Sequence, residues 1–312
     1  MVEPVESGSD GVTWRVFLQG RFVEPEEAVV RLDDAGFQHG IGLFETLAVR
    51  HGAAFRAGAH LERLEVSARE LGLVDGLDTG SLAEAIDQTI KHNHLREARL
   101  RLTLTAGPVS LLPGRGEPVR PMPTLAIQPT PATEYDPRYF EEGVMALISP
   151  SHANPLDPTA GHKTLNYWQR LRTLRQAAAA GAGEAIWLSV TNHLASGSIS
   201  NLFLVKDGVV STPIARGEEV QGSLGSPVLP GVTRAAVLES AAAEGIEAHK
   251  RMLTIDDLLD ADEVFLTNSG WQLLPVTKIE RQEIGGGRIG PVTAKLRASL
   301  LELIEREAGL GS

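Results

Sequence analysis

The stretch 230–234, with the sequence PGVTR, combines residues that suit the binding of an anion. Apolar residues recur at helical spacing directly after it, so we expect a helix that begins at about Gly231. The first turn of a helix carries unpaired N–H groups and the positive end of the helix dipole, and both favour a phosphate or a carboxylate. The hydroxyl of Thr233 adds a further donor. Taken alone, the same residues also suit a Pro-Gly turn before an ordinary helix.

Arg63 is a second candidate for anion binding. It lies on the flank of an expected helix whose apolar stripe includes Leu61 and Leu64. The planar guanidinium group presents paired donors that match a phosphate. An arginine on a helix flank is commonly a solvated charge. Because Arg63 lies beside the stripe and one turn from Ser67, its side chain can nevertheless point into a cleft.

Five segments in a fixed order resemble the class IV aminotransferases, also called fold type IV pyridoxal-phosphate enzymes. They are residues 34–46 (DAGFQHGIGLFET), 60–64 (HLERL), 161–167 (GHKTLNY), 231–234 (GVTR) and 263–270 (EVFLTNSG). The family includes branched-chain and D-amino acid aminotransferases and aminodeoxychorismate lyase. The resemblance implies a pyridoxal-phosphate-dependent aminotransferase that acts on amino acids and keto acids.

In this family the lysine of the third segment forms a Schiff base with pyridoxal 5′-phosphate and moves a proton during the reaction. The resemblance therefore makes Lys163 the catalytic residue, because only a primary amine can form that bond. It also implies which residues bind the cofactor: Arg63, Lys163, Tyr167, Ser196, Gly231, Val232, Thr233, Thr267 and Asn268. The substrate-binding residues that it implies are Phe44, Arg101 and Ser269.

The match departs from the family at the residue that faces the ring nitrogen of the cofactor. In the family this is a glutamate, five residues before the asparagine of a "TEGS.SN.F" segment. The corresponding segment here is 193–203, HLASGSISNLF, in which Ser196 replaces the glutamate. A carboxylate keeps the nitrogen protonated and the ring strongly electron-withdrawing, whereas a serine can only hydrogen-bond a neutral nitrogen. We therefore expect slow transamination, unless Glu184, Asp207 or another carboxylate reaches the nitrogen from a neighbouring strand.

Several functions stay open within the family. The chain could be an aminotransferase with a relocated carboxylate, a β-eliminating lyase similar to aminodeoxychorismate lyase, or a cofactor-binding relative with weak transaminase activity. D-amino acid aminotransferases have an arginine at the position of Ala106, and its absence argues against that substrate class. The string HKTLNY at 162–167 is closer to the lyase and D-amino acid branches than to the branched-chain branch.

Two other classes of protein remain as alternatives. A non-enzymatic sugar- or nucleotide-binding α/β protein would explain the Gly-rich segments as turns, and near-visible absorbance would distinguish the two cases. A metal hydrolase would use histidines, of which the candidates are His39, His60, His152 and His162. These histidines form no H-x-x-x-H or H-E-x-x-H pair, so we expect no metal site.

The composition limits the partners and the location. A net charge of −11 with scattered basic residues argues against nucleic-acid binding. The chain contains no cysteine, which excludes disulfides and thiolate chemistry. No stretch approaches the roughly 20 apolar residues of a membrane span, and the first residues are acidic and polar. We expect a cytoplasmic protein with small-molecule substrates and no membrane partner. The resemblance implies a homodimer, because family members close the pocket with a loop of the partner.

The elements that must position these residues follow from periodicity and from turn signals. We expect a hairpin at 14–23 around Gly20, a helix at 60–71 and a second helix from Ser81, as N-cap, to His92. Expected strands are 99–106, 124–128, 143–149, 184–190, 201–206, 246–253 and 263–270. Further helices are expected at 166–180, 231–244 and 291–307.

Dense prolines between Pro108 and Pro137 predict a loop followed by a linker. The expected fold is α/β (α+β), the two-domain fold of the type IV pyridoxal-phosphate enzymes. Residues 1–12 are expected to be a disordered tail, and 13–131 a small N-terminal α+β domain. Residues 132–312 are expected to be a larger, cofactor-binding C-terminal α/β domain.

Overall fold

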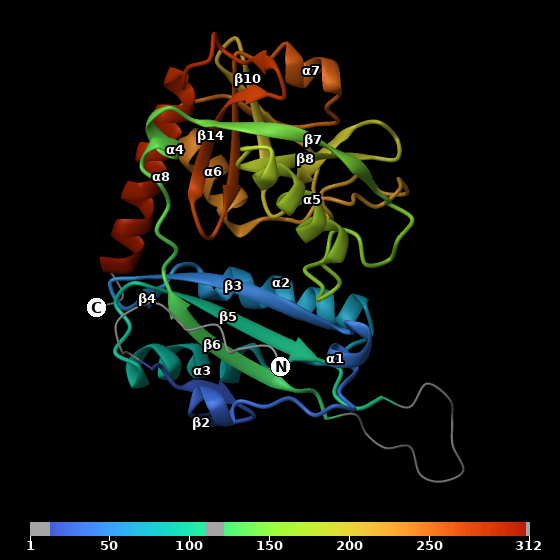
Figure 1. Cartoon of the computed structure of the whole chain (residues 1–312), viewed down its shortest axis with the longest axis vertical. Helices are drawn as coiled ribbons and strands as arrows, with labels where there is room; N and C mark the ends of the chain where they lie inside the picture. The colour runs from blue at the N-terminus through green and yellow to red at the C-terminus, as the bar shows by residue number, and fades with distance from the viewer. Residues whose placement is uncertain (1–12, 110–121, 310–312) are drawn as a thin grey trace.

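The computed structural model describes residues 13–109 and 122–309, and the tail expected at residues 1–12 lies outside them. Within the described residues the strands form two curved sheets, one above the other in Figure 1. In spatial order, the first contains β2 (Arg21–Val23), β1 (Val16–Leu18), β6 (Leu125–Pro131), β5 (Ala98–Thr105), β3 (Gly42–Arg50) and β4 (Ala53–Ala54). Its helices are η1 (Pro25–Glu27), α1 (Ala35–His39), α2 (Ala57–Glu70) and α3 (Thr79–His92).

The second sheet is mixed, with parallel pairs at β7–β8, β7–β14 and β11–β12 and antiparallel pairs elsewhere. Its strands are β12 (Ala248–Lys250), β11 (Val209–Thr212), β10 (Asn201–Lys206), β13 (Glu263–Asn268), β14 (Gln272–Ile279), β7 (Val144–Ala153), β8 (Glu184–Ser189) and β9 (Leu194–Gly197), with β15 (Gln282–Glu283) beside β14. Its helices are α4 (Arg138–Glu141), α5 (Trp168–Ala179), α6 (Val232–Ala243), α7 (Ile255–Leu259) and α8 (Pro291–Gly309).

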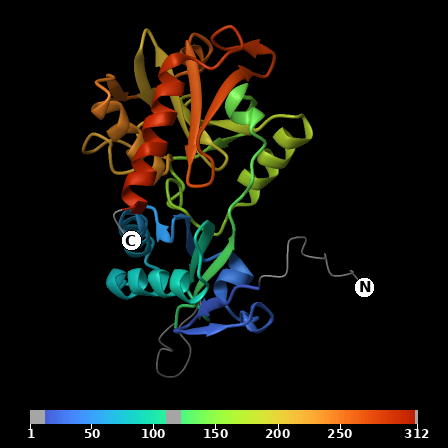
Figure 2. The ribbon, with the colours of Figure 1, turned by 90° about the vertical axis from the view of Figure 1, so that its left-hand side faces the viewer.

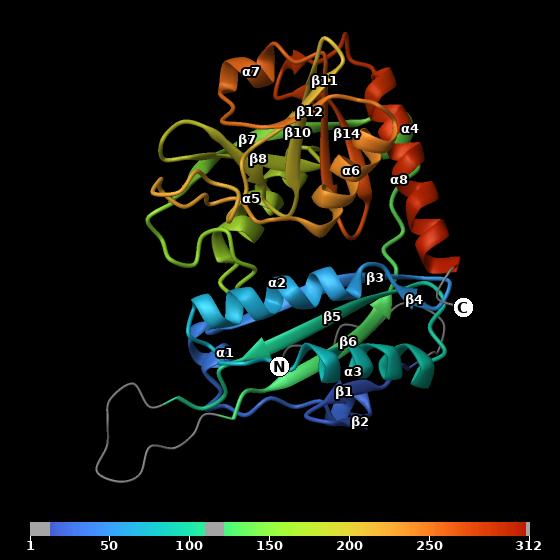
Figure 3. The ribbon, with the colours of Figure 1, turned by 180° about the vertical axis from the view of Figure 1, so that it is seen from behind.

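The two faces of β3 have different roles. Leu43, Glu45 and Leu47 point toward α2 and α3, which cover the same face of the first sheet in Figure 3. Phe44 and Thr46 alternate with them and point toward the second sheet, where they line a cavity. The sequence did not predict this strand, because residues 34–46 were interpreted only as a segment that resembles the family. A strand that is buried on both faces lacks the alternation of polar and apolar residues that identifies a half-buried strand.

Each sheet has its own apolar core. In the second sheet Phe203 and Phe265 stack at 4.8 Å between ring centres and pack against α6 and α8. Alternate residues of the same strands, such as Leu202 and Leu266, pack in a separate cluster on the opposite side. No residue of the first sheet's buried cluster belongs to either of these clusters. We propose that the chain divides between β6 and α4, close to the expected boundary of 131 and 132.

The two sheets are also joined by ion pairs at one end of the molecule. Figure 2 shows α8 running from the second sheet down to the first. There, Arg56 at the start of α2 pairs with Glu239 on α6 and with Glu307 on α8, at 2.5 Å and 3.0 Å. His51 contacts Glu305 at 2.5 Å. These contacts hold α2 beside α6, which both border the cavity described below.

Most expected elements are present, with two corrections. The N-cap of α3 is Asp78, whose side chain accepts from the N–H of Ser81 at 3.0 Å, so the assignment of Ser81 as N-cap was wrong. Both residues are good caps, and only the backbone conformation decides between them. The strand expected at 124–128 continues to Pro131 as β6. It tolerates Pro129 and Pro131 because β1 pairs only with Ala126 and Ile127, which leaves that edge open.

A buried charged cluster fixes α2 on β3. Glu45 is 1% exposed and His60 is 2% exposed, and Glu45 Oε2 lies 2.7 Å from Nδ1 of His60. Arg63 donates to both carboxylate oxygens, at 2.9 Å and 2.5 Å. Burial by itself would raise the pKa of Glu45, but Arg63 and His60 outweigh burial and lower the pKa to about 2. Burial lowers the pKa of His60, so the cluster is stabilised by a neutral imidazole.

The change Glu45→Gln should lower the free energy of unfolding by about 3 kcal/mol near neutral pH, because Arg63 loses its buried partner. The folded pKa is below the ordinary 4.5, so this stability is complete above 4.5 and is lost as the pH falls toward 2. The difference between wild type and variant in urea unfolding should therefore shrink below pH 4.5. As a control, Glu65→Gln removes a surface ion pair with Arg69 on α2, and it should change the free energy of unfolding by less than about 0.5 kcal/mol. If the stability difference between wild type and Glu45→Gln did not depend on pH, this role of Glu45 would be contradicted.

Candidate active site

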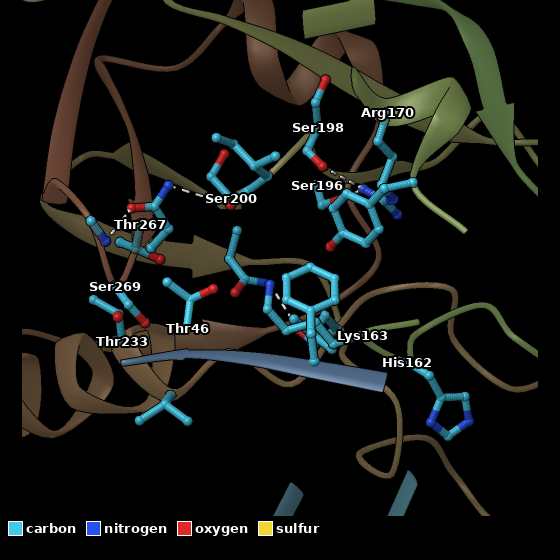
Figure 4. Close-up of a pocket in the computed structure, with 18 of the residues that line it drawn as sticks. Thr46, His162, Lys163, Arg170, Ser196, Ser198, Ser200, Thr233, Thr267 and Ser269 are labelled. Carbon is cyan, nitrogen blue, oxygen red and sulfur yellow. Dashed lines mark hydrogen bonds between the residues drawn. The ribbon is translucent and has the colours of Figure 1, made fainter. Parts of the chain in front are cut away.

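A cavity of about 420 Å³ lies between the two sheets. One wall is formed by β3 and β5, and the others by loops of the second half of the chain at 161–171, 196–201, 227–233 and 267–270. Figure 4 shows hydroxyl side chains on several sides of this cavity, among them Thr233, Thr267 and Ser196. The cavity therefore collects polar groups from segments that are far apart in the sequence.

Lys163 lies in a segment that pairs with β3. The N–H of Phe44 donates to the carbonyl of Lys163 at 2.9 Å, and the N–H of Leu165 donates to the carbonyl of Gly42 at 2.9 Å. A side chain at Gly42 would crowd this pairing, because a Cβ there would lie 2.7 Å from Cδ1 of Leu165. The pairing holds the lysine backbone against the first sheet, and its amine lies 4.4 Å from the centre of the Phe44 ring.

Tyr167 completes this corner of the cavity. Its ring meets Phe44 edge to face, with 5.1 Å between ring centres. The amine of Lys163 lies 5.6 Å from the centre of the Tyr167 ring. Burial alone would raise the pKa of Tyr167, but the positive charges of Lys163 and Arg170 outweigh burial and lower the pKa. A phenol with a lowered pKa is a stronger hydrogen-bond donor to a neighbouring anion or nitrogen.

The first turn of α6 faces the cavity with Val232 and Thr233. No side chain caps this turn, so its N–H groups have no side-chain acceptor. Across from it, at the end of β13, Oγ1 of Thr267 is buried and has no hydrogen-bond partner among the described residues. A buried hydroxyl without a partner is costly. The helix dipole and these donors together favour an anion at this place.

Gly231 contributes space rather than a contact. It does not line the cavity, and a Cβ at this position would collide with Oδ1 of Asn201. The amide of Asn201 in turn donates to the carbonyl of Leu229 at 2.9 Å. A larger residue at 231 would push Asn201 away and shift the start of α6.

Arg63 lines the cavity but is far less solvated than a residue on a helix flank, with 10% of its side chain exposed. Besides the two bonds to Glu45, it donates to the carbonyl of Pro230 at 2.9 Å. A guanidinium has five N–H donors, so these bonds still leave donors for an anion in the cavity. The alternative of a solvated charge was therefore wrong, because a sequence pattern does not show which carboxylate lies beneath the helix. The expectation that Arg63 can point into a cleft is confirmed.

The wall built by the first sheet carries two of the three expected substrate residues, Phe44 and Arg101. Thr46 pairs directly with Arg101 across β3 and β5, and the guanidinium of Arg101 lies 3.9 Å over the centre of the Phe44 ring. Burial lowers the pKa of Arg101. No carboxylate of the described residues forms an ion pair with Arg101. Its guanidinium can therefore bind the carboxylate of a ligand. Arg99, two residues earlier on the same face, also lines the cavity.

Asn268 and Ser269 both line the cavity at the end of β13. The side-chain oxygen of Asn268 accepts from the N–H groups of Gly270 and Trp271, at 2.8 Å and 3.0 Å. Its amide lies 3.4 Å from the carbonyl of Ile199. Asn268 therefore shapes the turn after β13, and Ser269 is the residue there whose side chain is left for a ligand.

Arg170 borders the cavity beside Ser196, and the sequence analysis did not identify it. Its Nη1 donates to Oγ of Ser196 at 3.3 Å and to the carbonyls of Gly197 and Ser198, at 3.1 Å and 3.2 Å. The residue lies one helical turn after Tyr167, and this spacing was the available signal. An arginine on a helix is so often a surface charge that the spacing alone could not single it out.

The residues that line the cavity include five cationic side chains and no carboxylate. The cationic residues are Arg63, Arg99, Arg101, Lys163 and Arg170. Glu184 and Asp207, the alternative partners for a ring nitrogen, are not among the lining residues. Both oxygens of the buried Glu184 are bonded to the turn at 198–200, and burial raises its pKa. The cavity thus favours ligands with several negative charges.

Two of the four histidines considered as metal ligands have other contacts. His60 is bonded to Glu45, and Nδ1 of His162 lies 2.9 Å from Oγ of Ser67. No group of three or more His, Cys, Asp or Glu in residues 13–109 and 122–309 is placed to hold a metal ion. No helix in the same residues combines the length and the apolar character that a membrane span requires.

Comparison with known proteins assigns the chain to a family. A family model described as amino-transferase class IV matches residues 42–279. The D-alanine aminotransferase of Listeria monocytogenes is 29% identical over 298 residues, which are 95% of this chain and 98% of that protein. The branched-chain-amino-acid aminotransferase of Escherichia coli K12 is 29% identical over 299 residues, 94% of this chain and 93% of that protein.

Solved structures agree with the match. The crystal structure of the E. coli branched-chain amino acid aminotransferase has a TM-score of 0.84 at 28% identity, covering 94% of this chain and 95% of the other. The 4-amino-4-deoxychorismate lyase of Pseudomonas aeruginosa has a TM-score of 0.77 at 30% identity, covering 92% and 98%. With its two-sheet α/β fold and a match over most of its length, this chain belongs to the class IV aminotransferases, a family of pyridoxal-phosphate enzymes.

Proposed function

We propose that Lys163 bonds the cofactor of this aminotransferase and that the cavity moves an amino group between an amino acid and a keto acid. The observation that carries the proposal is the arrangement of groups around the cavity. The cavity is lined by the amine of Lys163, by the start of α6, which favours an anion, and by several arginine side chains, but by no carboxylate. Pyridoxal phosphate supplies an aldehyde that reacts with amines and a ring that withdraws electrons. The residues fit it, because the unpartnered hydroxyl of Thr267 and the start of α6 would receive its phosphate.

The proposed roles follow from position. The amine of Lys163 would hold the cofactor through its aldehyde, and the same amine would move a proton at the substrate carbon that bears the amino group. Val232, Thr233 and Thr267 bind the phosphate together with Arg63, while Gly231 and Asn268 shape the backbone around it. Tyr167 and Ser196 border the ring. Arg101 binds a substrate carboxylate, with Phe44 and Ser269 beside it.

A lyase is the second candidate, and the absence of a carboxylate among the lining residues favours it, because elimination depends less on a protonated ring. The structural likeness to the P. aeruginosa lyase adds support. The two reactions differ in what they require. Transamination consumes a keto acid acceptor, whereas elimination proceeds without one. Assays of amino acid donors with and without added keto acids therefore separate the two functions.

The proposal includes a homodimer and a cytoplasmic location. Large apolar side chains are exposed beside the cavity, among them Phe37 on α1 (68%) and Trp168 on α5 (76%). The end of α1 lies close to the segment before α5, because a Cβ at Gly40 would be 3.9 Å from the backbone of Asn166. Exposed apolar groups of this size favour a protein interface. A chain without cysteine has no need of an oxidising compartment, which supports the cytoplasm.

Replacing Lys163 with alanine should abolish the near-visible absorbance of the bound cofactor and reduce turnover at least a thousandfold (about 4 kcal/mol), because the covalent bond and the proton-moving amine are both lost. Borohydride reduction of the wild type, followed by peptide mapping, should place the modified residue at Lys163. Lys206→Ala, at an exposed strand end, is the matched control and should retain both properties. Modification of a different lysine would overturn the assignment.

Thr267→Val keeps the shape of the side chain but removes the unpartnered hydroxyl. We expect it to weaken cofactor binding about tenfold, the effect of one lost hydrogen bond, without lowering the unfolding midpoint of the apoenzyme. The control is Thr293→Val, since Oγ1 of Thr293 on α8 is also buried without a partner but lies outside the cavity. Titration of each apoenzyme with pyridoxal phosphate measures the cofactor affinity of the two variants. Equal affinity in the two variants would argue against a phosphate at Thr267.

The oligomeric state is tested by sedimentation velocity at micromolar concentration. The wild type should sediment as a dimer, and Trp168→Asp should shift it toward the monomer, because a charge would be buried in the interface. Val190→Asp, a similarly exposed position in the turn after β8, should leave the dimer intact. A wild-type monomer with full cofactor occupancy would refute the dimer.

A further inference from the structure

The wall around Ser196 carries a permanent positive charge. Arg170 is held there by three acceptors, namely Oγ of Ser196 and the carbonyls of Gly197 and Ser198, at 3.3 Å, 3.1 Å and 3.2 Å. Its guanidinium also lies 5.2 Å from the centre of the Trp187 ring. No carboxylate within the described parts of the chain forms an ion pair with it. Arginine does not lose its proton in proteins, so this charge is present at every pH of interest.

Ser196 connects that charge to the cavity. Its Oγ accepts from Arg170 and donates its own proton to the carbonyl of Gly197 at 2.9 Å. A hydroxyl has one proton and can turn it toward the best acceptor within reach. Because a cation already donates to Oγ, the hydroxyl proton becomes a better donor. A ligand atom that meets Ser196 is therefore best matched if it accepts a hydrogen bond, which a protonated nitrogen cannot do.

The neighbouring acid does not offset this arrangement. Glu184 is 0% exposed, and its Oε1 accepts from the N–H groups of Ala185 and Ser198 at 2.9 Å and 3.1 Å. Its Oε2 accepts from the N–H of Ile199 and the hydroxyl of Ser200 at 3.2 Å and 3.0 Å. Glu184 therefore stabilises the turn from behind and has no oxygen left to face the cavity.

The orientation of the cofactor follows from its own geometry. Its aldehyde and its phosphate arm are on adjacent ring carbons, and the ring nitrogen lies opposite the carbon that carries the aldehyde. If the aldehyde is at Lys163 and the phosphate at Thr233 and Thr267, the nitrogen points away from Lys163. Figure 4 places Ser196 and Arg170 across the cavity from Lys163 and away from the two threonines.

We infer that Arg170 is a positioning residue that keeps the ring nitrogen of the bound cofactor unprotonated, acting through the hydroxyl of Ser196. The inference rests on the proposed function, because the direction of the nitrogen depends on Lys163 and on the phosphate contacts. Arg170 thereby limits how strongly the ring withdraws electrons. Arg170 would also affect a carboxylate introduced at position 196, because that carboxylate would pair with Arg170 instead of with a protonated ring nitrogen.

The test is nitrogen-15 NMR of the holoenzyme loaded with pyridoxal phosphate labelled at the ring nitrogen. The wild type should show the chemical shift of an unprotonated pyridine from pH 6 to pH 9. Arg170→Gln should raise the pKa of the nitrogen by about one to two pH units, because the positive charge beside Ser196 is removed. Arg170→Lys retains the cation and should behave like wild type. Arg172→Gln, an exposed arginine on the same helix, should have no effect.

The double variant Arg170→Gln with Ser196→Glu should hold the nitrogen protonated over the whole range, because the new carboxylate has no competing cation. A protonated nitrogen in the wild type, or the same titration in wild type and Arg170→Gln, would overturn the role of Arg170. Borohydride fixation at Lys163 in the same samples reports separately on the proposed function. A cofactor attached elsewhere refutes that function, whereas correct attachment with a protonated nitrogen refutes only this inference.

Discussion

The guanidinium of Arg63 joins the two halves of the molecule. It bonds both oxygens of Glu45 on β3 and the carbonyl of Pro230, which precedes α6. One planar group thus sets the position of the first sheet relative to the helix start that faces the cavity. A buried ion pair is costly unless its hydrogen bonds are satisfied, and His60 supplies a further partner for Glu45. The cavity exists because this junction holds its two sides at a fixed separation.

The distribution of charge around the cavity is the second constraint. Four of its five cationic side chains form no ion pair with any carboxylate of the described residues, whereas Arg63 is neutralised from behind by Glu45. Such a field attracts ligands that carry phosphate and carboxylate groups. It also disfavours a proton on any weakly basic ligand atom close to Arg170. The same charges therefore select the ligand and influence its chemistry.

Much of the fold could be predicted from the sequence, because its signals are local. The helices α5, α6 and α8 begin within two residues of the expected positions, since apolar periodicity and the Pro-Gly start are properties of neighbouring residues. β3 was not predicted, because burial of both faces removes the alternating pattern. The solvated interpretation of Arg63 failed for a related reason, since its partner Glu45 is on another element.

The sequence by itself determined the family, the lysine within its characteristic string, the helix start at Gly231 and the replacement of a carboxylate by Ser196. Only the tertiary structure decided what surrounds Ser196. Arg170 reaches a hydroxyl 26 residues further along the chain, and Glu184 is directed into the turn behind it. Such contacts depend on how a helix packs against a strand end, and no local pattern of residues encodes that distance. The charge beside Ser196 is therefore a property of the folded chain.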